Sequence, residues 1–208
     1  MSKLLSSAAV ALVLSTAAEA ATAVVDGQST LTIVQDLDAL NLTVEPVDGA
    51  VKEFPQFEQP VFTFPIAGGE VGEGLSGWIV HSGGLVISDG SSDLELGDFT
   101  IDFDTGQVFG DVDAVPTGSI ADARLFNLSI PSPIPSGGAI EIVDDLTFAL
   151  TYTDETIGAL EAVFGTGLGI NTDDQFGSLA SNPQAIPVPG AALLLAPVAA
   201  IAMMRRRR

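Results

Sequence analysis

The chain has 208 residues, of which 27 are acidic and seven are basic, so its formal net charge at neutral pH is −20. A chain this acidic should repel nucleic acid and anionic lipid, which argues against nucleic-acid partners. It contains no cysteine, which excludes disulfides, thiol catalysis and thiolate metal sites.

The first 23 residues have the pattern of a secretory signal peptide. Lys3 supplies a positive start, Leu4 to Leu14 form an apolar stretch, and Ala18-Glu19-Ala20 or Ala21-Thr22-Ala23 offers a small-x-small site for signal peptidase. We therefore expect a signal helix over residues 1–23 and an exported protein. An uncleaved N-terminal anchor is the alternative.

Between the two ends, we expect one exported β-domain at residues 24–170 and a polar linker at 171–184. This middle part has two basic and 26 acidic residues, which gives a net charge of −24. Strands are expected first at 31–34, 41–44 and 61–64, with a loop over most of 45–60, where prolines interrupt the pattern.

The clearest strand pattern lies between residues 77 and 114. Runs at 78–81, 85–88, 93–96, 99–103 and 107–112 are separated by Gly, Asp and Ser, which is typical of antiparallel β-structure. Phe99, Ile101 and Phe103 alternate with polar residues and share one sheet face. Gly106 suits the tight turn that follows. The pattern predicts a β-meander.

Further strands are expected at 123–130, 139–143, 146–152 and 167–170, with one helix at 153–164. Thr153 or Asp154 can cap this helix, and Gly165 can end it. The expected fold is therefore all-β, an antiparallel sandwich or meander with one short helix, plus the signal helix and a C-terminal transmembrane helix.

The C-terminal segment, residues 185–208, predicts that last helix. Residues 185–204 carry no charge, and 20 helical residues span roughly 30 Å, the thickness of a bilayer's hydrocarbon core. Four arginines then follow, and such a cluster favours a cytoplasmic end. Its members are Arg205, Arg206, Arg207 and Arg208.

This segment resembles the PEP-CTERM class of sorting signals, in its VPLPA-type variant. The residues that carry the resemblance are Ile186, Pro187, Val188, Pro189 and Gly190, the apolar span and the terminal arginines. Val188 stands where the PEP form has Glu, and Gly190 where the variant usually has Ala. The resemblance implies an exosortase-like membrane protease that removes the tail, delivery to the cell surface or extracellular matrix, and exopolysaccharide as a candidate partner. An uncut membrane anchor is the alternative.

The meander resembles the haem-binding HtaA-type β-domain. The likeness rests on residues 62–66, His81 with Gly83-Gly84-Leu85, and the hairpin at 99–112. In that family a tyrosine upstream of the sheet ligates haem, and a histidine near the Gly-Gly turn supports it. Here no tyrosine precedes His81, because Tyr152 is the only one in the chain.

His81 and Tyr152 are therefore the candidate haem-binding residues. For both residues the sequence favours a structural position over haem binding: an exposed turn position for His81, and for Tyr152 a ring in the core with its hydroxyl at the rim. Candidate calcium ligands cluster around one hairpin, although a solvated acidic face is the competing interpretation. They are Asp98, Asp102, Asp104, Asp111 and Asp113.

No pattern of catalytic residues stands out. No Gly-x-Ser-x-Gly elbow frames a serine, and carboxylates are too plentiful to single out a pair. We therefore expect no enzyme, no resident cofactor other than a possible calcium ion, and a structural or adhesive role at the cell surface or in the extracellular matrix. The alternative function is a ligand-binding module for calcium, glycan or haem.

Overall fold

The computed structural model describes residues 21–53, 59–72, 74–115, 118–130, 143 and 146–185. The predicted signal helix, apart from residues 21–23, and the sorting motif with its arginines lie outside these residues. So does the predicted strand at 139–143, apart from Val143. Within the described part, no helix is both long enough and apolar enough to span a membrane.

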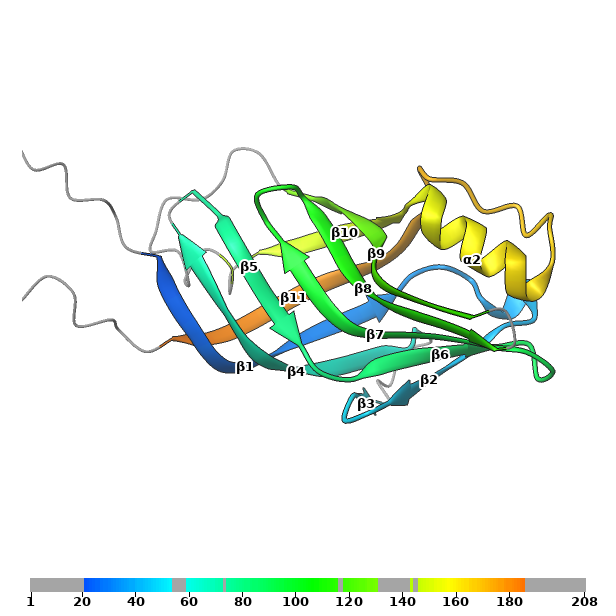
Figure 1. Cartoon of the computed structure of the whole chain (residues 1–208), viewed down its shortest axis with the longest axis horizontal. Helices are drawn as coiled ribbons and strands as arrows, with labels where there is room; N and C mark the ends of the chain where they lie inside the picture. Colours follow the sequence, from blue (N-terminus) through cyan, green and yellow to red (C-terminus); the bar gives the residue numbers. More distant parts are fainter. Residues whose placement is uncertain are drawn as a thin grey trace, which may run out of the picture.

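The described strands form one continuous antiparallel sheet that closes on itself (Figure 1). The ring runs β5, β4, β1, β11, β10, β9, β8 and β7, and β7 pairs back to β5. The bounds are β1 Thr22–Ile33, β2 Thr43–Val47, β3 Val51–Glu53, β4 Val61–Gly72, β5 Ser76–His81, β6 Gly84–Ser88, β7 Asp93–Asp102, β8 Gln107–Val115, β9 Gly118–Ser129, β10 Thr147–Tyr152 and β11 Gln175–Ala185.

This arrangement confirms the all-β prediction. Consecutive strands from β6 to β11 are neighbours, as in a meander, whereas the described strands do not divide into the two sheets of a sandwich. The strand β2 overlaps the predicted strand at 41–44 and continues to Val47, and β3 lies in the segment predicted to be mostly loop. No strand forms at the predicted 167–170 segment.

The long strand β7 joins two predicted strands through a bulge at Asp98. Its first half pairs with β6 and its second half with β5. The register with β8 shifts between Gly97 and Thr100, and Asp98 has a left-handed φ of 50°. An ideal Cβ on Gly110 of β8 would lie 2.7 Å from the Gly97 carbonyl oxygen, so only glycine fits there without a shift. At this bulge the pairing partner of β7 changes from β6 to β5.

The core fills the inside of the closed sheet, because alternate residues of each strand point inward. Burying each large apolar side chain contributes about 1.5–3 kcal/mol. The largest fully buried apolar side chains include Phe62, Phe148, Phe176, Ile33, Leu42, Ile79, Leu85, Ile87, Leu94, Leu96 and Ile101.

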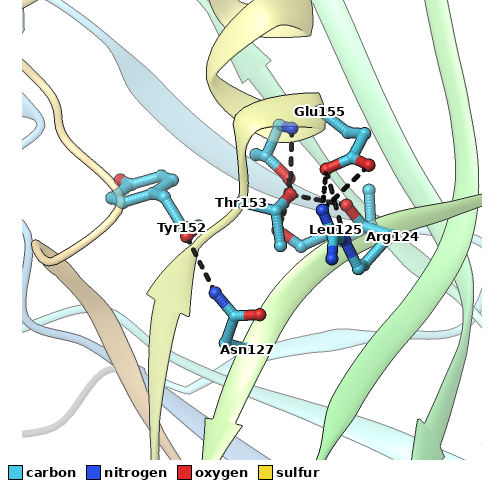
Figure 2. A network of polar contacts seen from close by, with 7 residues as sticks. Arg124, Leu125, Asn127, Tyr152, Thr153 and Glu155 are labelled. Carbon is cyan, nitrogen blue, oxygen red and sulfur yellow. Dashed lines mark hydrogen bonds and ion pairs between the residues drawn. The ribbon is translucent and has the colours of Figure 1, made fainter. Parts of the chain in front are cut away.

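The helix α2, Asp154–Phe164, begins where the sequence predicts. Thr153 is its N-cap and accepts a hydrogen bond from the Thr156 amide. The Thr153 hydroxyl also reaches the carbonyl oxygens of Arg124 and Leu125 on β9, at 2.6 and 3.1 Å. Arg124 forms a bidentate ion pair with Glu155 in the first helical turn, at 2.8 and 3.0 Å (Figure 2). These contacts attach α2 to the sheet. A separate 3₁₀ turn, η1, spans Asp38–Leu40.

The linker prediction is wrong for most of residues 171–184, because β11 occupies residues 175–185 and pairs with both β1 and β10. The polar composition of this segment suggested a linker, but some of its small and polar residues face the inside of the sheet. Gly177, Leu179 and Ser181 all have buried positions on this strand. β11 is therefore part of the closed sheet.

Candidate functional site: a buried histidine–serine network

The most unusual group in the core is His81, at the end of β5. Only 3% of its surface is exposed, so the expectation of an exposed turn residue is wrong. Alternation along β5 explains its position, because Ile79 and His81 face the interior while Trp78 faces outward.

Two serines on neighbouring strands accompany the histidine. Ser29 of β1 lies opposite Ser181 of β11 in the strand register. The Ser29 Oγ lies 2.6 Å from His81 Nε2 and 2.7 Å from Ser181 Oγ. Both serines are at most 2% exposed. Three strands thus bring three polar side chains together inside an apolar core.

The proton positions follow from the partners. His81 Nδ1 lies 3.3 Å from the Phe99 carbonyl oxygen, which can only accept, so Nδ1 carries the proton. In the neutral ring, Nε2 is then an acceptor, and the Ser29 hydroxyl donates a hydrogen bond to it. The Ser29 oxygen in turn accepts a hydrogen bond from the Ser181 hydroxyl. Each of these three side chains therefore has a partner, as buried polar groups require.

Burial keeps His81 neutral. It lowers the pKa of the imidazole to about 4, and the hydrogen bond to Phe99 opposes this shift only in part. At neutral pH the side chain is an uncharged nitrogen base with one lone pair, on Nε2.

The network lies against a small apolar cavity of about 30 Å³. This is space on the scale of a water molecule. Nine strands supply the lining, which is apolar apart from Ser29 and His81, and the aromatic members are Phe64, Phe99 and Phe126. Phe64 and Phe99 pack edge to face, with ring centroids 5.2 Å apart.

Tyr152 does not belong to the lining of this cavity. Its ring packs against Phe126 and Phe176, and Figure 2 shows it on the far side of β10 from the Arg124–Glu155 pair. The tyrosine is 1% exposed, and its hydroxyl is buried without a hydrogen-bond partner in the described structure, so the expected position at the rim is wrong. Burial, with Asp174 nearby, raises the pKa of Tyr152. The two candidate haem-binding residues therefore lie at different places.

The five candidate calcium ligands also divide into two groups. Asp98, Asp111 and Asp113 line a surface groove of about 430 Å³ together with Asp48 and Glu95. The other two, Asp102 and Asp104, lie outside that lining, at the β7–β8 turn, where Asp102 accepts the Thr105 amide. Burial and then the charges of Asp48, Asp113 and Asp98 raise the pKa of Glu95. Among the described residues, no group of three or more His, Cys, Asp or Glu is arranged to hold a metal ion.

Sequence reasoning missed Ser29 and Ser181. For Ser29 a signal was present, because Ser29, Leu31 and Ile33 alternate on the inward face of one strand. A polar residue in such an inward series predicts a buried polar contact. Its partner on β11 had no comparable signal, because that strand was read as a linker.

A closed antiparallel sheet defines this protein's architecture, and solved structures have a similar fold. The crystal structure of the C-terminal domain of HtaA from Corynebacterium glutamicum matches with a TM-score of 0.51 and 14% identity, covering 79% of this chain and 99% of that one. The crystal structure of the heme-binding protein HtaB from the same organism matches with a TM-score of 0.52 and 14% identity, covering 81% and 98%. No family model and no curated protein matches the sequence.

These matches support the likeness of the core to HtaA-type domains at the level of the fold. They also correct the expectation that the chain has no cofactor other than a possible calcium ion. One of the matched structures is that of a heme-binding protein.

Proposed function

We propose that this chain is an exported ligand-binding domain whose ligand is haem, and that His81 Nε2 would be the nitrogen donor to its iron. The observation that carries the proposal is the buried, neutral imidazole with its Nε2 lone pair beside an aromatic-lined cavity. The fold shared with a haem-binding protein supports the same conclusion.

The donor chemistry fits haem. Histidines that ligate metals usually donate their other ring N–H to a carbonyl or carboxylate, which fixes the ring and its tautomer. His81 already has this arrangement, because its Nδ1 donates to the Phe99 carbonyl. Bound haem would supply an iron centre that accepts a nitrogen ligand. The aromatic and aliphatic lining would contact the porphyrin.

The cavity of about 30 Å³ is much smaller than a porphyrin, so binding requires the wall beside His81 to open. The β7 bulge is one candidate place for this opening, because Phe99 lines the cavity and Asp98 beside it interrupts the regular pairing. The Ser29–His81 hydrogen bond must also break before Nε2 can reach another partner.

Haem titration of the full chain tests the proposal. We expect a Soret band that saturates at one haem per chain and weakens strongly in His81→Ala. Tyr152→Phe serves as the matched control, because Tyr152 is buried but does not line the cavity. It should bind as the parent does. Absence of any Soret change in the parent chain would end the haem proposal, and an unchanged band in His81→Ala would remove His81 as the donor.

We further propose that the chain reaches the cell surface or extracellular matrix through its signal peptide and its PEP-CTERM-like tail. The two end patterns in the sequence support this proposal. Mass spectrometry of the surface fraction, with and without the exosortase-like protease, would test it. We expect a mature chain without residues 186–208 only when the protease is present, and an intact tail in both strains would contradict the proposal.

A further inference from the structure

We propose a second binding site on the outer face of the sheet, where β4, β5, β7, β8 and β9 present a polar strip around Trp78 that binds a polysaccharide of neutral or amino-bearing sugars. This site is separate from the interior cavity and does not depend on haem binding.

The strip follows the strand register. Glu70 pairs with Trp78, Trp78 with Asp102, Asp102 with Gln107, and Gln107 with Asn127. All five are exposed or half-buried, since they occupy outward positions that alternate with core residues. Neighbouring strands lie about 4.8 Å apart, so the row across these five strands is roughly 19 Å long and follows the curved outside of the closed sheet. A sugar chain would therefore contact chiefly the middle of the row, around Trp78.

Trp78 is the anchor of this strip. It is the only tryptophan in the chain, and 41% of its surface is exposed. A tryptophan offers a rigid apolar ring with a polar N–H, and such residues dominate many binding surfaces. Outward Phe109 on β8 lies one row further along, opposite Thr100 of β7. An aromatic face beside carboxylates and amides suits a pyranose, which has an apolar C–H face and a rim of hydroxyls.

The negative charge around Trp78 limits which polysaccharides can bind there. Glu70 and Asp102 flank Trp78 on the two neighbouring strands. The basic side chains of the described residues are engaged elsewhere, Lys52 with Glu45 and Arg124 with Glu155, both at 2.8 Å. No described cation therefore neutralises the carboxylates beside the indole. A uronic-acid polymer would be repelled, whereas neutral sugars can donate hydroxyl protons and amino sugars can add an ionic contact.

The single tryptophan gives a direct readout. We expect the fluorescence of the full chain to shift and saturate with a cello-oligosaccharide, a chitosan oligosaccharide or both, and to remain unchanged with an alginate oligosaccharide. Isothermal titration calorimetry then compares the parent chain with its variants, because Trp78→Ala lacks the fluorophore. Trp78→Ala should weaken binding about tenfold or more. Asp102→Asn should weaken binding of the amino sugar more than binding of the neutral one.

Ile120→Ala is the matched control, because Ile120 is 60% exposed but lies away from the strip, at the start of β9. It should leave sugar binding unchanged. Binding of chitosan that persists in Trp78→Ala would identify a general attraction to the acidic surface and overturn the proposal. A lack of binding to both the neutral and the amino oligosaccharide would also overturn it.

Discussion

At the scale of single residues, His81 makes stability depend on pH. The unfolded chain takes up a proton near the ordinary histidine pKa of 6.5, whereas the folded chain resists protonation until about pH 4. Between these values the unfolded state binds more protons, so stability is full above pH 6.5 and falls as the pH decreases toward 4. The shift corresponds to at most about 3 kcal/mol.

Urea denaturation at several pH values between 7.5 and 4 tests this prediction. The acidic surface also titrates near the lower end, so the informative quantity is the difference between the parent chain and His81→Gln. We expect this difference to diminish steadily on acidification, and a constant difference would contradict the assignment of a neutral His81.

Tyr152 leads to a second prediction at this scale. A buried hydroxyl without a partner in the described structure has lost its hydrogen bonds to water without replacement. We expect Tyr152→Phe to leave the free energy of unfolding unchanged or to raise it by up to about 1 kcal/mol. Thermal melting measures the effect, and a large loss of stability would show that the hydroxyl has a partner.

At the scale of secondary-structure elements, Thr153 connects α2 to β9. Thr153→Ala removes the N-cap and the contacts to the Arg124 and Leu125 carbonyls. We expect it to cost about 2 kcal/mol, at the upper end for a cap. Thr153→Ser keeps the hydroxyl and should recover most of the stability. Chemical denaturation of both variants checks this, and an equal loss in both would point to the methyl group instead.

The elements also show what could be predicted from sequence. The helix was predictable because its cap, its apolar face and Gly165 are local signals. The strands β5 to β8 were predictable because of their alternation. Strand β11 was not, because inward Gly177 and Ser181 are recognisable only from their partners across the sheet. The burial of His81 was not predictable either, because it depends on Ser29 of β1 and Ser181 of β11. The sequence marked His81 as a candidate haem-binding residue only because it is the single histidine in the chain.

At the scale of the whole molecule, the acidic surface opposes folding through its own repulsion. The two basic residues between the terminal segments are both paired, so almost all of the negative charge is uncompensated. Salt screens such repulsion, with a Debye length of about 10 Å at 0.1 M. We therefore expect the melting temperature to rise between 0.02 M and 0.5 M NaCl. Calorimetry measures the rise, with KCl as a check for ion-specific effects, and a fall would show that attractive pairs dominate.

The pairing of β1 with β11 places Val24 opposite Ala185, so the polypeptide enters and leaves the sheet at the same end (Figure 1). This has a mechanical consequence. A force applied between these two points pulls the strands apart from one end and breaks their hydrogen bonds one after another. It does not stretch all of the bonds together, as it would if the two points lay at opposite ends of the paired strands. A weak force between the start of β1 and the end of β11 should therefore be enough to separate these two strands. If the chain is tethered at only one of these two points, no force acts between the strands and the sheet is not strained.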